Sequence, residues 1–187
     1  VEHYAQRNLN IAEQFLQLAR VEAEESVEMV EQDMLDVIES AIDQVQIQAQ
    51  GRKITLQFDY DPDQDVWVRG NNELLERLVV NLLTNAVKYS GDAKAVEVRL
   101  YAGGGQVCCD VRDHGVGIPE AFQDRLFERF SRASSSGGAR TRGAGLGLRF
   151  VKVVTERHGG DIQVESVPDQ GSCFRLALPR IDVGGLS

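Results

Sequence analysis

Two amide side chains and one ammonium group stand at helical spacing in the segment NNELLERLVVNLLTNAVKYS. Asn81, Asn85 and Lys88 are separated by four and three residues, so a helix would place them within about 60° of one another along one edge. The same helix would carry a broad apolar face made of Leu75, Leu78, Val79, Leu82, Leu83 and Ala86. Amide oxygens suit a hard cation such as Mg²⁺, which proteins share with substrate phosphates. A polar face that is merely rich in amides is the alternative.

A carboxylate and two glycines follow an apolar stretch in the segment DHGVGIP, residues 113–119. Gly115 and Gly117 permit close backbone approach, and Asp113 can accept hydrogen bonds but cannot donate them when ionised. The exocyclic amine of adenine would satisfy that acceptor. The carbonyl oxygen of guanine would face it as a second acceptor, at a cost of roughly 1 to 3 kcal/mol or more. Taken alone, Asp-x-Gly-x-Gly is an ordinary turn.

Three glycines, Gly143, Gly145 and Gly147, open the last expected helix in the segment RGAGLGL. Backbone amides at a helix N-terminus form an anion site, which favours phosphate. The segment is not a Walker loop, because no Gly-Lys-Ser/Thr follows. It is not a dinucleotide-binding fingerprint either, because the spacing differs and no strand precedes it. Residues 131–142, rich in serine, glycine and arginine, have the composition of a mobile lid.

The elements that would position these groups are strands and helices in mixed order. From Lys53 onward ITLQFDY and VWVRG predict strands, and residues 73–89 predict a helix capped by Asn71 or Asn72. Residues 94–113 predict a hairpin, residues 145–158 a helix ended by two glycines, and DIQVES with GSCFRLALP a closing pair of strands. We therefore expect a two-layer α/β sandwich, with helices on one face of a mixed, mostly antiparallel sheet.

The N-terminal region predicts a helical segment in two pieces. The first narrow apolar stripe consists of Ile11, Phe15 and Leu18 and suits packing on a partner helix. The second consists of Leu35, Ile38, Ile42, Val45 and Ala49 and suits docking on the following domain. An acidic stretch separates them, and Ser26 or Asp33 could cap the second helix there. We expect a boundary near residues 24–32.

Charge and composition exclude several classes of protein. The chain has 187 residues and a net charge of -9, and residues 1–65 alone carry 15 acidic against four basic side chains. Residues 125–149 hold six arginines and one acid, an island that could bind a compact polyanion or simply be a solvated loop. We expect no nucleic-acid binding, and no membrane helix because no apolar run approaches about 20 residues. Cys108, Cys109 and Cys173 lack metal-ligand spacing and are expected to be buried free thiols.

In their order and spacing, these segments resemble the ATP-binding domain of bacterial sensor histidine kinases. The matching segments are an Asn-x-x-x-Asn helix, Asp-x-Gly-x-Gly, FERFSR, Gly-x-Gly-Leu-Gly-Leu, HGGDIQVES and GSCFRLALP. These kinases share the Bergerat ATP-binding fold with gyrase, Hsp90 and MutL. The resemblance covers about Leu35 to Pro179.

The resemblance implies a set of ligands for ATP and Mg²⁺. Asn85 would hold the metal with Asn81 beside it, and Asp113 would bind the adenine amine. Asn81, Lys88 and Arg132 would act in catalysis and also contact the phosphates. Further nucleotide contacts would come from Tyr89, Gly115, Gly117, Ile118, Phe127, Phe130, Gly143, Gly145, Leu146, Gly147, Leu148 and Ser172. Ser172 stands where the family often has Thr, and either hydroxyl could orient a water beside the adenine-binding Asp.

The resemblance also favours phosphoryl transfer over hydrolysis. Hydrolytic relatives carry Glu at the position of Asn81, and an amide cannot accept a proton from water at neutral pH. Slow hydrolysis suits transfer of the γ-phosphoryl group to an imidazole. His3, His114 and His158 are not followed by the acid that sensor kinases place after their acceptor. We therefore expect the acceptor histidine to lie on a dimerisation domain outside this fragment.

Domain limits and partners follow from the same resemblance. Residues 1–28 would be the end of a dimerisation helix and a linker, residues 29–180 the ATP-binding domain, and residues 181–187 a tail. The expected partners are ATP or ADP, the kinase's own dimerisation domain in a homodimer, and the receiver domain of a response regulator. The parent would be a bacterial sensor anchored in the inner membrane, with this part cytoplasmic and without direct membrane contact. A serine kinase acting on an anti-sigma partner and a non-catalytic nucleotide-sensing module are the alternatives.

Overall fold

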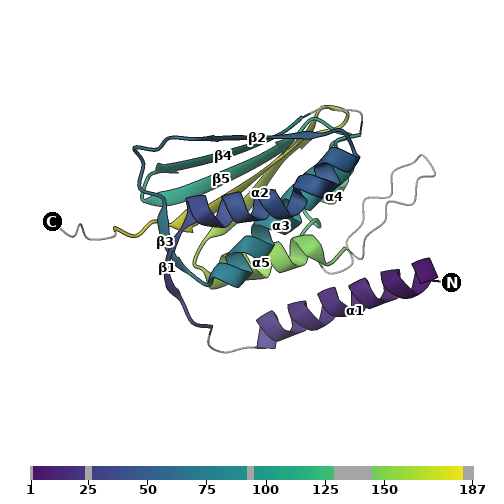
Figure 1. Cartoon of the computed structure of the whole chain (residues 1–187), viewed down its shortest axis with the longest axis horizontal. Helices are drawn as coiled ribbons and strands as arrows, with labels where there is room; N and C mark the ends of the chain where they lie inside the picture. The colour runs from purple at the N-terminus through teal and green to yellow at the C-terminus, as the bar shows by residue number, and fades with distance from the viewer. Residues whose placement is uncertain (1, 24–26, 92–94, 129–144, 183–187) are drawn as a thin grey trace.

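Helices cover one face of a five-stranded sheet in the computed structural model of the chain (Figure 1). The structure describes residues 2–23, 27–91, 95–128 and 145–182, with side chains from Ala12 onward in the first helix. The strand order in the sheet is β2-β4-β5-β7-β6. This arrangement confirms the two-layer α/β sandwich predicted from the sequence.

The sheet is mixed and mostly antiparallel, as predicted. Two hairpins, β4–β5 and β6–β7, supply four strands, and β5 pairs antiparallel with β7. Strand β2 is parallel to β4, so a crossover must join them, and it contains β3 and α3. The strands are β2 (Thr55–Tyr60), β4 (Ala95–Gly103), β5 (Gln106–Asp113), β6 (Asp161–Val167) and β7 (Gly171–Pro179).

Three helices, α2 (Met34–Gly51), α3 (Asn72–Tyr89) and α5 (Gly147–Arg157), pack on the sheet. The first turns of α2 and α3 are capped by predicted residues. The Asp33 carboxylate accepts from the Leu35 N–H at 2.9 Å and begins α2, and the Asn71 side chain accepts from the Leu74 N–H at 3.1 Å and begins α3. A fourth helix, α4 (Glu120–Gln123), is a single turn that the sequence pattern did not predict.

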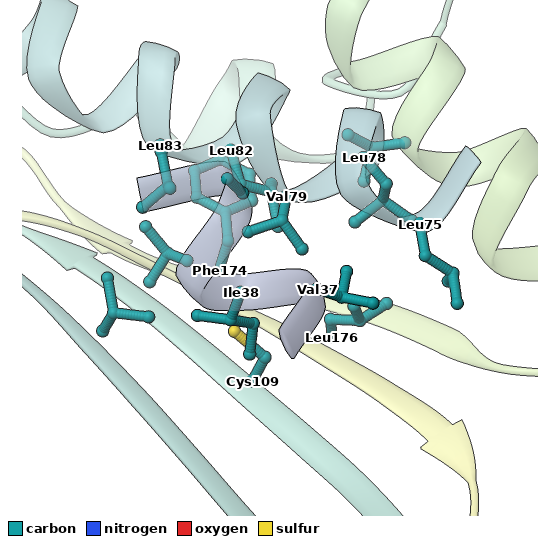
Figure 2. Close-up of a cluster of buried hydrophobic side chains, with 14 of the residues drawn as sticks. Val37, Ile38, Leu75, Leu78, Val79, Leu82, Leu83, Cys109, Phe174 and Leu176 are labelled. Carbon is teal, nitrogen blue, oxygen red and sulfur yellow. The ribbon is translucent and has the colours of Figure 1, made fainter. Parts of the chain in front are cut away.

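The core lies between these helices and the sheet (Figure 2). Ile38 of α2 and Leu75 and Leu83 of α3 are fully buried, and Figure 2 shows them facing side chains from β5 and β7. Because side chains alternate along a strand, Cys109 of β5 and Asp113 at its end share the side that faces the helices. The same alternation that builds the core therefore brings one carboxylate under the helices.

A second, two-stranded sheet adjoins the end of β7, where Val68 and Arg180 form an isolated β-bridge. Strand β1 (Val30–Asp33) pairs antiparallel with β3 (Trp67–Gly70), with Val30 opposite Gly70. The sequence predicted the strand near residue 67, but it gave residues 24–33 only as a boundary and a helix cap. The segment VEQD has a single apolar residue and no alternation, so only its partner strand reveals it.

The N-terminal helix α1 (Glu2–Ala23) packs against α5. Leu18 and Val21 of α1 are buried, and the Glu22 carboxylate pairs with the Arg149 guanidinium at 3.2 Å. Leu18 belongs to the stripe that we expected to pack on a partner helix, and here it is buried where α1 meets α5 of the same chain. Phe15, by contrast, is 43% exposed.

Candidate functional site

Helix α3 carries the three polar residues that the spacing brought together. Asn81, Asn85 and Lys88 are each half-buried. The Asn81 amide nitrogen donates to the Arg77 carbonyl oxygen at 2.9 Å, which aims the amide along the helix. Asn85 forms no hydrogen bond with any residue that the structure describes. The amide oxygen of Asn85 is therefore available to an external ligand.

The Lys88 ammonium lies over the aromatic ring of Tyr89. Its Nζ is 4.7 Å from the ring centroid and donates to the Tyr89 hydroxyl at 3.1 Å. An aromatic face attracts a cation and restricts the freedom of its side chain. The pair places a positive charge at the C-terminal end of α3, where a helix end attracts cations.

Asp113 is the buried carboxylate of the site. It is 5% exposed at the end of β5, and burial raises its pKa above the usual value of an Asp because the charged form loses water. Two backbone N–H groups oppose that rise. Gly115 donates to the carboxylate at 2.9 Å, and the Ser172 backbone also donates to it. The carboxylate can still accept further hydrogen bonds, and an amino group of a ligand could donate them.

The two predicted glycines are required by close backbone contacts. A Cβ on Gly115 would lie 1.9 Å from the Tyr89 carbonyl oxygen, which also accepts from the Val116 N–H at 3.4 Å. A Cβ on Gly117, whose φ is +63°, would lie 2.1 Å from the Val167 carbonyl oxygen. The turn after Asp113 is thereby fastened to α3 on one side and to the β6–β7 hairpin on the other.

A third glycine, Gly171, performs the same task and was missed by the sequence analysis. Its φ is +98°, and a Cβ would lie 2.1 Å from the Asp113 carbonyl oxygen. The glycine was visible at the start of the strand GSCFRLALP, but nothing in a strand pattern says which backbone comes close. Only the pairing of β5 with β7, with Asp113 opposite Ser172, does so.

Two polar residues that the sequence analysis did not single out hold the turn. Ser166 of β6 accepts from the Ile118 N–H at 2.8 Å, and its hydroxyl lies 2.9 Å from that of Ser172. The Gln123 amide of α4 donates to the carbonyl oxygens of Ile118 and Ser166, each at 3.0 Å. The sequence did indicate that the Ser166 side chain faces the core, because the alternation of DIQVES places it on the same side as Ile162, which is buried.

The first residues of α5 lie against α3. A Cβ on Gly147 would lie 2.8 Å from the Asn81 side-chain oxygen, so glycine lets the helix N-terminus approach this amide. Gly145 has a φ of +69°, and Leu146 is buried at 1% exposure. Leu148 and Phe127 are partly buried against the core. The predicted site residues Phe130, Arg132 and Gly143 lie outside the described residues.

The described site residues thus form two connected groups, one around Asp113 and one where α3 meets α5. Close contacts join Tyr89 of α3 to the turn after Asp113, and that turn to Ser172. Another close contact joins Asn81 of α3 to Gly147 of α5. A buried acceptor at one end and a cation, amides and a helix N-terminus at the other suit a ligand with an amino-bearing base and an anionic group.

Histidines and cysteines offer little competing chemistry within the described residues. The His114 Nε2 lies 2.8 Å from a Glu97 carboxylate oxygen, and His158 links two backbone groups of its neighbourhood. The three cysteines are buried and free, as predicted, and burial raises the pKa of Cys109 to about 12. A thiol with that pKa stays protonated and is a poor nucleophile. No cluster of three His, Cys, Asp or Glu side chains suits a metal in this part of the chain.

Comparisons with known sequences identify relatives of the chain. A family model described as histidine kinase-, DNA gyrase B- and HSP90-like ATPase matches residues 70–182. The chain is 33% identical to the sensor-like histidine kinase SenX3 of Mycobacterium tuberculosis, over 95% of this chain and 43% of that protein. It is also 33% identical to the circadian input-output histidine kinase CikA of Synechococcus elongatus, over 91% of this chain and 23% of that one. The chain therefore spans less than half the length of these relatives.

Solved structures share the fold. The mycobacterial sensor histidine kinase MprB superposes with a TM-score of 0.69 and 31% identity, covering 81% of this chain and 97% of that structure. Full-length ShkA in complex with AMPPNP superposes with a TM-score of 0.80 and 24% identity, covering 94% of this chain and 36% of that one. The family model and the match to MprB together show that the chain belongs to the histidine kinase-, DNA gyrase B- and HSP90-like ATPase family, as an ATPase domain of the sensor histidine kinase type.

Proposed function

We propose that the chain is the catalytic part of a sensor histidine kinase, which binds Mg-ATP and transfers the γ-phosphoryl group to a histidine on a dimerisation domain. The observation that carries the proposal is the buried Asp113 carboxylate, which lies at the junction of β5, β7 and the end of α3. Two backbone N–H groups already compensate in part for the water that this carboxylate loses on burial, and a carboxylate has room for a further donor. An adenine amine is such a donor.

Adenine would be recognised by Asp113 with the surrounding turn. The two backbone N–H groups that already donate to the carboxylate keep it oriented, and the amine of the base would add a third donor. Gly115, Gly117 and Ile118 would shape the edge of the pocket, because side chains at the two glycine positions would collide with neighbouring backbone. Ser172 would stand beside the base, and Tyr89 near the ribose.

The phosphates and the metal would be bound along α3 and at the start of α5. The residues fit Mg²⁺, because the amide oxygen of Asn85, which has no hydrogen-bond partner among the described residues, is a hard ligand. This metal takes most of its remaining ligands from phosphate and water. Bound there, Mg²⁺ would neutralise charge on the phosphates. Asn81 and Lys88 would contact the same groups, with Gly145, Leu146, Gly147 and Leu148 around them. Phe127, Phe130, Arg132 and Gly143 would contribute from the segment between α4 and α5.

The side chains favour transfer over hydrolysis. At the position where hydrolytic relatives carry Glu, Asn81 has an amide whose N–H donates to a carbonyl and which is not a base for water. The role of the chain's own residues would then be to orient the nucleotide and to stabilise charge, with Lys88 and Arg132 as the cations. Phosphoryl transfer needs little other help from a protein.

The acceptor histidine would be on another domain. His114 and His158 are engaged with neighbouring groups, which supports an acceptor elsewhere, and a response regulator would take the phosphoryl group next. We keep residues 1–28 as the end of a dimerisation helix, 29–180 as the ATP-binding domain and 181–187 as a tail. We place this part in the cytoplasm, within a sensor kinase anchored in the inner membrane. No helix in the described ranges combines the length and apolarity needed to cross a bilayer.

Labelled ATP tests the proposal. The whole chain would be incubated with Mg²⁺, ATP labelled on the γ-phosphate and a helical-hairpin dimerisation domain that carries a His followed by an acid. We expect label on the hairpin, and its loss when that His is replaced by Gln. Nucleotide binding without label on the hairpin would instead support the non-catalytic sensing module.

A further inference from the structure

Ser166 is a hydroxyl on a side of its strand that is otherwise apolar. In β6 it follows Ile162 and Val164 on the face toward the helices. A polar group at such a position needs hydrogen-bond partners, because the lost contacts with water cost free energy. None of the roles proposed above uses Ser166, although it lies within one hydrogen bond of Ser172.

Three groups surround the Ser166 hydroxyl, and one arrangement of protons satisfies all of them. The Ile118 N–H donates to the Ser166 oxygen at 2.8 Å, the Gly171 carbonyl oxygen lies 3.0 Å away, and the Ser172 hydroxyl 2.9 Å away. A hydroxyl has one proton and two lone pairs. Donation to Gly171 uses the proton, so the second lone pair of Ser166 must receive the Ser172 O–H.

This order of protons decides what Ser172 can offer. Its hydroxyl proton is directed at Ser166, so its lone pairs are left for other partners. The pairing of β5 with β7 sets Ser172 directly opposite Asp113, and the Ser172 backbone N–H donates to the Asp113 carboxylate. The end of the sheet therefore presents two acceptors, a carboxylate and a hydroxyl oxygen, and no side-chain donor from either.

The geometry points to Ser166 as a positioning residue that sets Ser172 as an acceptor and so sharpens the preference for a 6-aminopurine over a 6-oxopurine. The inference rests on the proposed function, in which Asp113 meets the base. Without Ser166, the Ser172 hydroxyl is free to turn and donate to a carbonyl at position 6 of the purine. The carboxylate would then be the sole acceptor that rejects the oxo group.

Calorimetric titration with ADP and with inosine diphosphate tests this role. We expect Ser166→Ala to lower the ratio of ADP affinity to inosine diphosphate affinity by about fivefold or more, the effect of one lost discriminating hydrogen bond. Ser166→Thr, which keeps the hydroxyl, should restore the ratio. Ser172→Ala removes the acceptor itself and should also lower the ratio, which tests the inference even where Ser166→Ala does not fold.

Two further variants separate positioning from loosening. Gln123→Ala removes the bonds from Gln123 to the carbonyls of Ile118 and Ser166 but leaves the hydroxyl pair intact. It should weaken both nucleotides by the same factor. Ser40→Ala removes a comparable hydroxyl, which donates to Glu76 at 2.8 Å on the α2–α3 contact, and should leave the ratio unchanged.

The outcomes distinguish the inference from the proposed function. An unchanged ratio in Ser166→Ala with both affinities reduced would overturn the inference, and so would an altered ratio in Gln123→Ala. In both cases wild-type protein still binds ADP, so the proposed function stands. Failure of the wild-type chain to bind ADP at all would overturn the proposed function and the inference with it.

Discussion

Replacing Asp113 by Asn removes one of the two acceptor oxygens in the site and adds a donor. The Gly115 N–H and the Ser172 backbone N–H both point at the carboxylate, and the adenine amine would be a third donor. An amide has a single oxygen, so its NH₂ group must face at least one of these donors. An unmatched buried donor costs about 1 to 3 kcal/mol. We therefore expect ADP to bind about 5- to 150-fold more weakly to Asp113→Asn.

Asp110→Asn is the matched control on the same strand. Asp110 lies three residues earlier on β5, on the opposite face, where both its oxygens accept from the Arg175 guanidinium at 2.9 Å. This replacement should lower the midpoint of thermal unfolding, modestly because Arg175 is partly exposed. It should leave ADP affinity unchanged. Calorimetric titration of both variants is the assay, and an ADP affinity that Asp113→Asn leaves within twofold of wild type would refute the reasoning.

The pH dependence of the same group has a definite sign. Burial raises the pKa of Asp113 in the folded chain, so folding without nucleotide favours the protonated carboxyl. Its contribution to stability is greatest below the unfolded pKa and is lost as pH rises through the folded pKa. The adenine amine requires the ionised form, so ADP affinity should fall as pH drops toward the raised pKa. Asp113→Asn should lack both trends.

Three other predictions concern the frame of the site. Gly115→Ala should lower the free energy of unfolding by about 1 to 3 kcal/mol or more, because the added methyl would collide with a backbone carbonyl. Gly103→Ala should be tolerated, because the space beside Gly103 is open. Chemical denaturation measures both variants. Burial lowers the pKa of His158, whose neutral Nε2 accepts from a backbone N–H. The contribution of His158 to the free energy of unfolding should therefore be present above pH 6.5 and be lost as pH falls through the lowered pKa. His158→Gln should flatten the dependence of that free energy on pH in this range. Asn81→Glu, which introduces a base for water, should increase ATP hydrolysis measured as phosphate release, and a rate equal to that of wild type would count against the role given to the amide.

The regular elements and the core were predictable because they depend on local periodicity. The stripe from Leu35 to Ala49 predicted a helix that docks on the following domain, and Ile38, Val45 and Ala49 are buried. Strand patterns predicted the hairpin at residues 94–113 and the closing pair of strands, and capping residues predicted where α2 and α3 begin. These features need only the chemistry of neighbouring residues, so a single sequence contains them.

Contacts between distant segments were not predictable from pattern alone. The partner of β3 is a four-residue strand without alternation. Leu18 lies in a stripe that would suit another helix equally well, and the fold decides that α5 covers it. Ser166 and Gly171 become site residues only when β6, β7 and the turn after β5 meet. The individual motifs are visible in the sequence, but only the topology shows which groups hold them in place.

A crystal structure of the chain with Mg²⁺ and a non-hydrolysable ATP analogue is the most direct test of the central claim. The account predicts that the base amine lies within hydrogen-bond distance of the Asp113 carboxylate and that Asn85 is a ligand of the metal beside the phosphates. A nucleotide bound away from Asp113, or one whose base contacts it without the amine, would contradict the account.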